Sequence, residues 1–427
     1  MTATPMSPSM NHFGTDTPCK SECSNVSPCF NIKKSTFEND RLNSPRSHQL
    51  QQGCMEFVRS ASVCGSGVSS FLVDTLGRRE QINAITSFID GSNVYGSDSE
   101  RAKKLRIEHD PAGRLRFFDT SEYPKPMLPF SEEQSDESVE MDCRRMIERE
   151  TIEEARVSCF MAGDVRANEQ IGLTATHTIF LRAHNRFAEE LHKLNPHWPG
   201  DQVYLETRKI IGAIIQRITY NEWLPAILGA DGMAKLGSYH GYDETVNPAI
   251  QNVFATAAFR FGHALIKPII RRLDDNLQTD PVYGDVPLFK AFFNPFRLIK
   301  EGGVDPIIRG LTFTASKDRR IEENGPFNKD LLERLFQASD EIALDLGALN
   351  IQRGRDHGIP FYVEWRQHCK LSVPTTFDEL RGIFDPDAIR KLRALYKQVY
   401  NFTHSKIKFV PLLTPASCFK LILPIFQ

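Results

Sequence analysis

Four segments of the chain place polar side chains capable of chemistry where the flanking pattern is apolar. In one of them His263 lies in an apolar run, with Arg260 three residues before it. An imidazole is a common metal ligand, but a single histidine on an apolar helical face is more often a core residue hydrogen-bonded to a carbonyl. This stretch alone leaves both interpretations open. The four segments are Ile85–Ser97, Ala162–Arg186, Ala258–Pro268 and Leu349–Pro360.

Two further histidines, His177 and His184, share one face of a predicted helix. They are seven residues apart, which is about 10 Å along a helix axis, so they cannot bind one metal ion together. We therefore predict that both have structural roles.

The periodicity of apolar residues predicts a mainly α fold without internal repeats. Helices are predicted over 173–194, over 201–229 with Asp201 as N-cap, and over 328–349. A further helix is predicted to begin near Arg79, to break at Gly91 and to resume before Arg106. These elements must position the four polar segments.

The composition excludes several functional classes. The chain has 427 residues and is 41% hydrophobic, and its 52 Lys and Arg against 54 Asp and Glu give a formal charge of -2. Such a chain can bury a large core and carries no overall field that would attract nucleic acid or an anionic membrane. The apolar C-terminal stretch contains Pro411, Pro415 and Pro424, which argue against a membrane-spanning helix. We expect partners that are small molecules or proteins.

The nine cysteines are crowded toward the N-terminus, five of them within the first 64 residues. Their C-x3-C-x5-C spacing is not a usual zinc pattern, so it favours disulfides and an oxidising compartment. Residues 1–75 are predicted to form an irregular, disulfide-rich strip. The first residues show no signal-peptide pattern.

In their order along the chain, the four segments resemble the animal haem peroxidase family, and its peroxidasin branch more than the leukocyte or thyroid enzymes. The resemblance runs from about Cys19 to about Phe402. It implies a haem peroxidase-like helical domain, incomplete at both ends, with an N-terminal strip at 1–75, a helical core at 76–402 and a divergent tail at 403–427. It also implies haem b and calcium as cofactors.

The resemblance assigns His263 as the proximal ligand of the haem iron and Asn350 as the acceptor of its other ring N–H, which would make the ligand more basic. Arg260 is similar to the arginine that binds a haem propionate. Arg353 stands where the family has another arginine close to the haem, with a surface ion pair as the alternative.

On the opposite side of the haem, Arg166 is similar to the distal arginine, a permanent cation for the departing peroxide oxygen. Glu169 matches the carboxylate that forms an ester to a haem methyl. Gln170 stands where the leukocyte enzyme has a haem-bonded methionine, so no sulfonium link is expected.

A calcium loop is also implied, formed by Thr86, Phe88 through its carbonyl, Asp90 and Ser92. Alternating oxygen donors on one turn suit a hard cation. Without the resemblance this segment would be an ordinary helix-to-turn junction.

The chain departs from the family at its beginning, because the Q-x-x-D-H-D motif with the distal histidine is absent and His12 lacks the flanking aspartates. A positioned general base contributes roughly 10²–10⁴ in rate, so a weak peroxidase is expected. The implied disulfides are Cys19–Cys29, Cys23–Cys54 and Cys143–Cys159. Cys369 is expected to pair within the altered tail, with Cys418 as a possible partner, and Cys64 is left over.

The function implied is that of a peroxidase that uses hydrogen peroxide to oxidise a halide, namely bromide, or another small donor, within a secreted, extracellular parent that can act on extracellular-matrix proteins. One alternative is a catalytically inactive haem-binding or matrix-adhesion module. Another is a fragment that does not fold, because missing helices would expose apolar surface.

Overall fold

The computed structural model of the chain describes residues 29–33, 54–66, 77–120, 123–131, 143, 158–317, 327–339 and 342–396. Helices dominate these residues, which confirms the predicted mainly α class. The α-helices are α2 (Ser92–Tyr95), α3 (Ser99–Lys104), α4 (Ile171–Leu194), α5 (Gly200–Arg217), α6 (Leu224–Leu236), α7 (Asn252–Thr256), α8 (Phe296–Lys300), α9 (Asp305–Phe313), α10 (Lys329–Glu333), α11 (Leu346–Asp356), α12 (Tyr362–His368) and α13 (Pro386–Leu395).

Shorter helical segments and small sheets connect these helices. The 3₁₀ segments are η3 (Val165–Asn168), η5 (Ala258–Leu265), η6 (Leu288–Lys290) and η7 (Asp378–Leu380), and η4 (Ile218–Trp223) is a π-helix. Four antiparallel two-stranded sheets pair β1 (Ile32–Lys33) with β2 (Cys54–Met55), β3 (Phe118–Thr120) with β4 (Tyr123–Met127), β5 (Ile269–Ile270) with β6 (Val286–Pro287), and β7 (Leu335–Ser339) with β8 (Ile342–Leu344).

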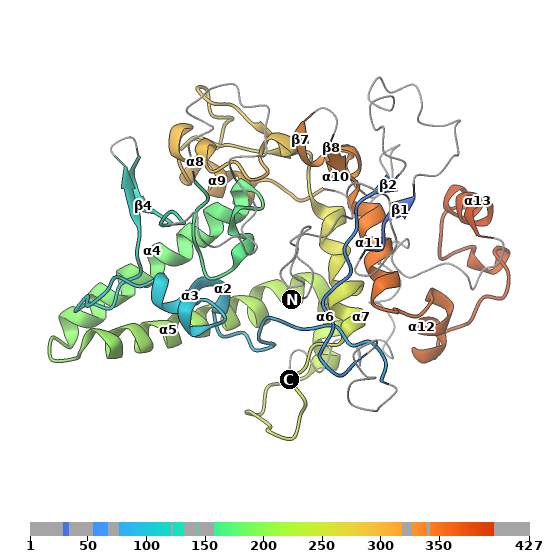
Figure 1. Ribbon diagram of the computed structural model, residues 1–427, viewed down its shortest axis with the longest axis horizontal. Coiled ribbons are helices and arrows are strands. Elements are labelled where there is room, and N and C mark those ends of the chain that lie inside the picture. Colours follow the sequence, from blue (N-terminus) through green and yellow to red (C-terminus); the bar gives the residue numbers. More distant parts are fainter. Residues whose placement is uncertain are drawn as a thin grey trace.

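The two longest helices, α4 and α5, pack along each other and form one side of the molecule (Figure 1). The Gln170 side chain caps α4 by accepting a hydrogen bond from the Gly172 backbone N–H. The short connection contains Pro196 and Pro199, which end one helix and start the next. The buried face of α4 follows a spacing of three and four residues through Ile171, Thr174, Ala175, Thr178, Leu181, Asn185 and Ala188.

Several predicted elements were wrong. Residues 79–90 are not helical, because their first residues pair instead with 61–63, through hydrogen bonds from the Val63 N–H to the Glu80 carbonyl and from the Ile82 N–H to the Ala61 carbonyl. The predicted helix over 328–349 is instead α10, the β7–β8 hairpin and the start of α11. The N-cap of α5 is Pro199 rather than Asp201, and a π-helical turn at 218–223 interrupts the predicted helix over 201–229.

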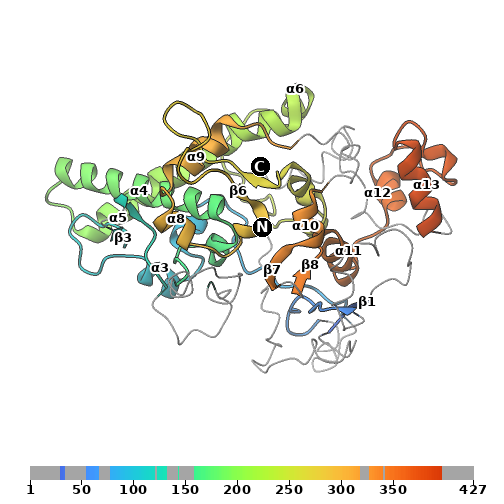
Figure 2. The same ribbon diagram turned by 90° about the horizontal axis from the view of Figure 1, so that it is seen from above.

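Two main hydrophobic clusters hold the described residues together. The larger one surrounds α4 and includes Tyr95, Phe160, Ile171 and Leu298. A separate cluster lies between α12 and α13, which stand apart from the other helices in both views (Figure 2). Helix α11 precedes this second cluster in the chain.

The described part of the predicted N-terminal strip lies against α11. Gln352 Nε2 donates to the Phe30 carbonyl at 2.6 Å, and the backbone N–H of Ser60 donates to Asp356 at 2.8 Å. The boundaries predicted at 75 and 402 remain predictions, and the tail at 403–427 lies outside the described residues. Within the described ranges, no helix has the length and apolar character needed to cross a bilayer.

Candidate functional site

His263 lies on η5, a 3₁₀ segment of eight residues. Runs of 3₁₀ helix longer than three or four residues are uncommon, and they often mark functional positions. Burial, followed by the nearby Arg260 cation, lowers the pKa of His263 to about 4. The imidazole is therefore neutral near pH 7, and among the described residues none hydrogen-bonds its Nε2 atom. A neutral ring with an open nitrogen is the form that binds a metal ion.

Asn350 contacts His263 from α11, as predicted. Its Nδ2 atom lies 3.0 Å from His263 Nδ1, while its Oδ1 accepts a hydrogen bond from Arg260 Nη1 at 2.6 Å. A guanidinium has only donors, so Arg260 takes the amide oxygen. Which atom donates between Asn350 and His263 depends on the tautomer of the ring, and the acceptance of the ring N–H by Asn350 stays a prediction.

Arg260 is a partly buried cation without a carboxylate partner among the described residues. Its Nε atom donates to the Thr256 carbonyl at 2.6 Å, which together with the bond to Asn350 fixes the side chain. Burial, and then repulsion from Arg353, lowers its pKa to about 10. A buried cation without a counter-ion favours binding of an anionic group beside His263.

Arg353, unlike Arg260, has a buried counter-ion. Its Nη1 atom donates to Asp356 and to the Val58 carbonyl, both at 3.0 Å, and its guanidinium lies 4.1 Å from the centre of the Phe57 ring. Burial nevertheless lowers the pKa of Arg353. The alternative of a surface ion pair is wrong, because the Asp356 side chain is completely buried.

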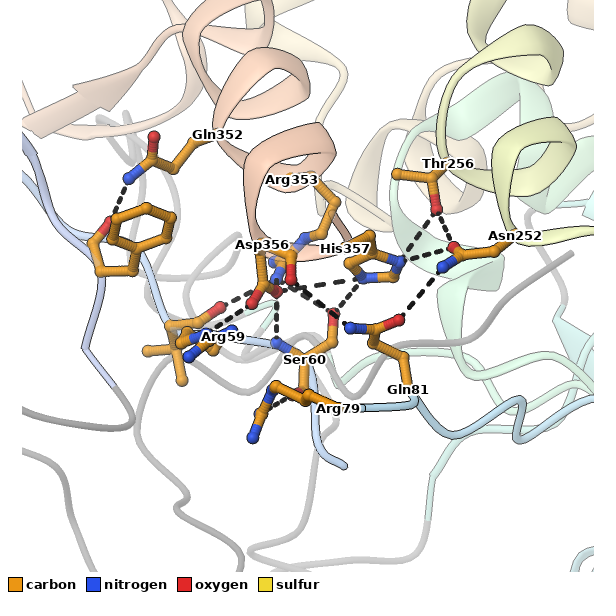
Figure 3. A network of polar contacts seen from close by, with 12 residues as sticks. Arg59, Ser60, Arg79, Gln81, Asn252, Thr256, Gln352, Arg353, Asp356 and His357 are labelled. Atoms are coloured by element: carbon orange, nitrogen blue, oxygen red, sulfur yellow. Dashed lines mark hydrogen bonds and ion pairs between the residues drawn. The ribbon is translucent and has the colours of Figure 1, made fainter. Parts of the chain in front are cut away.

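A network of polar contacts around Asp356 joins the N-terminal strip to α11 and α7 (Figure 3). Sequence reasoning missed it. Asp356 accepts from Arg59 Nε at 2.7 Å, and His357 contacts Ser60, Asn252 and Thr256. The contacts span separations of up to 297 residues, and no local pattern could have indicated them.

Arg166 lies on η3, and Glu169 is the residue that follows it. Arg166 makes a bidentate ion pair with Asp164, through Nε at 2.9 Å and Nη2 at 2.6 Å. Hydrogen bonding to Asp164 raises the pKa of Arg166. Asp164 was not predicted, although its position two residues before Arg166 at the start of η3 is the signal that could have revealed it.

The partly buried carboxyl of Glu169 makes no side-chain hydrogen bond to a described residue. Burial raises the pKa of Glu169 to about 7, against the lowering effect of Arg166. An acid in this state can exchange its proton near neutral pH and is open to a binding partner.

The two histidines of α4 have structural partners. The His184 ring contacts the Tyr95 hydroxyl at 2.8 Å and the Gly113 carbonyl at 3.1 Å, and burial lowers the pKa of His184 to about 4. His177 is buried near Asp164 and hydrogen-bonds the Asn93 backbone, and burial lowers its pKa too. No described group of three or more His, Cys, Asp or Glu side chains could hold a metal ion.

Three residues of the predicted calcium loop, Thr86, Phe88 and Asp90, precede α2, and the fourth, Ser92, begins it. Asp90 Oδ1 accepts from the Ser92 N–H at 2.8 Å, and Thr86 Oγ1 accepts from the Phe88 N–H at 3.2 Å. Asp90 is the one carboxylate among the four predicted ligands, and its Oδ2 lies 4.0 Å from Arg208 Nη2. These contacts join residues two positions apart in the loop. The calcium site remains a prediction.

The predicted disulfide Cys143–Cys159 is confirmed. Cys29, Cys54 and Cys369 are also disulfide-bonded, and Cys64 is an exposed free thiol, as expected for the residue left over. The predicted partners Cys19, Cys23 and Cys418 lie outside the described residues, as does His12.

The open groups fit the haem that the sequence resemblance implies. His263 offers a neutral ring nitrogen to a metal. Within the described part of the chain, Arg260 has no carboxylate partner and the Glu169 carboxyl has no hydrogen-bond partner. Haem carries a metal, two propionates and reactive methyl groups. Each open group therefore has a counterpart on the same ligand.

Comparison with known proteins agrees with this chemistry. The family model for the animal haem peroxidase matches residues 1–402. The chain is 48% identical over 412 residues to the peroxidasin homolog of Mus musculus, covering 96% of this chain and 26% of that protein. It is 42% identical over 382 residues to the thyroid peroxidase of Sus scrofa, covering 88% of this chain and 39% of that protein. The chain thus spans about a quarter of the length of the peroxidasin homologs it matches.

A solved structure shares the fold. Peroxidase A from Dictyostelium discoideum superposes with a TM-score of 0.73 at 28% identity, covering 94% of this chain and 73% of that chain. The higher identity to the peroxidasin homolog than to the thyroid enzyme agrees with the branch predicted from the sequence.

Proposed function

Because this chain belongs to the animal haem peroxidase family, we propose that it is a haem peroxidase domain of peroxidasin type that uses hydrogen peroxide to oxidise a halide or another small donor. The observation that carries the proposal is the set of contacts joining Arg260, Asn350 and His263. It places a neutral imidazole beside a cation that has no carboxylate partner among the residues the structure describes. Bromide is the halide we expect.

In this proposal His263 holds the haem iron through Nε2, and Arg260 pairs with a propionate. Arg353, held by Asp356, adds a second positive charge on the same side. When bound, haem would supply the redox chemistry by which peroxide is reduced and the donor is oxidised. Asn350 orients the His263 ring through Nδ1 and limits its rotation.

Arg166 provides the permanent positive charge for the peroxide oxygens. Its bidentate contact with Asp164 holds the guanidinium plane in one orientation, so little reorganisation is needed when negative charge develops. Glu169, three residues further on, presents the carboxyl that we propose forms an ester to a haem methyl. The Glu169 carboxyl has no hydrogen-bond partner in the described ranges, which supports this role.

We also propose that calcium binds to Thr86, the Phe88 carbonyl, Asp90 and Ser92. The intact parent would be extracellular, in keeping with the disulfides, and its oxidation product would act on extracellular-matrix proteins. The support for these last statements is the family membership and the oxygen donors at 86–92.

The decisive experiment is an absorption spectrum of the purified chain after addition of haem, recorded beside the spectrum of His263→Ala. We expect a Soret band in the unsubstituted chain, called the parent chain from here on, and no band in His263→Ala. His184→Gln is the matched control, because it removes another buried histidine whose pKa is lowered to about 4. No band in the parent would contradict the proposal.

A peroxide assay then separates the two functional classes. Turnover of bromide by the haem-loaded parent would identify an enzyme. A Soret band with no reaction toward peroxide would instead identify an inactive haem-binding or matrix-adhesion module.

A further inference from the structure

The hydrogen bonds around His357 have a defined direction. Gln81 Nε2 donates to the Asp356 backbone carbonyl at 3.4 Å, and a carbonyl can only accept. The other end of the Gln81 amide, Oε1, therefore accepts a hydrogen bond from Asn252 Nδ2 at 3.1 Å. This leaves Asn252 Oδ1 to accept from His357 Nδ1 at 2.8 Å. His357 therefore carries its proton on Nδ1.

The remaining ring nitrogen must then accept. Ser60 Oγ lies 2.7 Å from His357 Nε2 and donates its hydroxyl proton to it, while Arg353 Nη1 donates to Ser60 Oγ at 3.1 Å. Each step fixes the next, from Arg353 through Ser60 and His357 to Asn252 (Figure 3). A buried network is rigid when every donor and acceptor in it has a partner, because its side chains then have one favourable arrangement.

The network ends at both buried arginines of the candidate site. Arg353 is its first donor. At the other end Thr256 Oγ1 donates to Asn252 Oδ1 at 2.8 Å, and the Thr256 carbonyl accepts from Arg260 Nε at 2.6 Å. Side chains thus link Arg353 to Thr256, and the backbone carbonyl of Thr256 completes the link to Arg260. The two cations repel each other.

The order Ser60, His357, Asn252 is that of a nucleophile, a base and an orienting group. Ser60 is only 2% exposed and its hydroxyl already contacts Arg353, so no substrate can reach it. Its role must be exerted through its neighbours.

We propose that Ser60 and His357 are positioning residues of the haem site, which hold the guanidiniums of Arg353 and Arg260 in the orientation that receives the haem carboxylates. This inference rests on the proposed function. It predicts that the hydroxyl of Ser60, and not only the packing around it, affects haem binding.

The test compares Ser60→Ala, which removes the hydroxyl, with Ser60→Thr, which keeps it. His357→Leu and His357→Gln form a second pair, because glutamine can both accept from Ser60 and donate to Asn252. Ser372→Ala is the control, since Ser372 Oγ also accepts from an arginine, Arg366, at 2.8 Å, but in the α12 region. The readouts are haem affinity and the sign and intensity of the Soret circular dichroism, which reports haem orientation.

We expect Ser60→Ala and His357→Leu to weaken haem binding by about 10- to 100-fold and to alter the Soret dichroism. Ser60→Thr, His357→Gln and Ser372→Ala should stay within about twofold of the parent. Unchanged haem affinity and dichroism in Ser60→Ala would overturn the proposal, even if its thermal stability fell. That result would show that the network stabilises the fold and does not affect haem binding. If His357→Leu does not fold, the Ser60 pair decides.

A measurement without haem separates this inference from the proposed function. In the haem-free chain, the arginine side-chain N–H signals of Arg353 and Arg260 are followed by nuclear magnetic resonance and assigned with Arg→Lys variants. We expect slow exchange with water in the parent and fast exchange in Ser60→Ala. Equal exchange in both chains would overturn the positioning role, whereas a parent without a Soret band would contradict only the proposed function.

Discussion

At the scale of single residues, Glu169 and Arg166 differ in how their charges are balanced. Arg166 forms an ion pair with Asp164. The Glu169 carboxyl has no hydrogen-bond partner among the described residues, and burial raises its pKa to about 7. A buried, partnerless carboxyl is costly for a fold, and such costs are concentrated at functional positions.

Glu169→Gln tests the proposed ester. The amide has nearly the same size but cannot form the ester, so haem should bind and yet be extracted by acidified organic solvent after peroxide treatment. Haem in the parent should resist this extraction. Glu189→Gln, at an exposed position beside Arg114, should behave as the parent. Complete extraction of haem from the parent would exclude the ester.

Arg166→Ala should slow the reaction of the haem-loaded chain with peroxide by about 10²–10³, the usual effect of removing a group that stabilises developing charge. Asp164→Asn should slow it less, by about tenfold, because the cation remains but is held less firmly. The measurement is stopped-flow absorbance at the Soret band. Asp201→Asn, which alters the exposed pair with Arg106, is the control and should change the rate by less than twofold.

At the scale of elements, η3 and α2 are in direct backbone contact. The Asp164 N–H donates to the Asn93 carbonyl at 3.0 Å. A Cβ atom at Gly163 would lie 2.5 Å from Gly96 N and from Ser92 O, so glycine is required there. The segment Ser92–Gly96, which begins with the last predicted calcium ligand, thus fixes the position of Asp164, which orients Arg166.

Gly163→Ala should therefore lower the free energy of unfolding by about 1–3 kcal/mol and also slow the peroxide reaction. Gly212→Ala is the matched control on α5, where the added Cβ would meet Asp90 O at an ordinary 3.7 Å. This control should leave the unfolding free energy unchanged or raise it by up to about 1 kcal/mol. Urea unfolding followed by circular dichroism measures both. A neutral Gly163→Ala would show that the contact can relax.

The sequence predicted those parts of the fold that depend on local periodicity. Helix α4 was predicted to within two residues because its buried face repeats every three or four positions. The β7–β8 hairpin was read as helix because its strands are short and lack alternation. The resemblance indicated that Asn350 lies beside His263, but it did not indicate that Arg260 contacts the same amide. Ser60 and Asp164 were missed because their importance arises only from contacts.

At the scale of the whole molecule, the buried histidines make stability depend on pH. Burial lowers the pKa of His184 and of His357 to about 4, while the unfolded chain has a value of about 6.5. Between these two values the unfolded state binds more protons than the folded state, so stability rises with pH across this window. The stabilisation is complete above about pH 6.5 and is lost on acidification toward pH 4.

We therefore expect the unfolding free energy to fall between pH 7 and pH 4.5, by up to about 3 kcal/mol for each of these histidines. His184→Gln should be less stable at pH 7 but should show a shallower dependence on pH. Urea unfolding at three pH values in this range measures the slope. An unfolding free energy that is flat across the range would show that the rings are hydrated in the folded chain.

The contact between Ser60 and His357 joins residues 297 positions apart. Ribosomes add roughly 5–20 residues per second, so about 15 to 60 s pass between synthesis of the serine and synthesis of its partner. During this interval the N-terminal segment has no α11 to dock on. The contacts that link Arg353 and Arg260 to this network are complete only once translation has passed residue 357. On the proposed function, haem insertion would therefore follow the synthesis of α11.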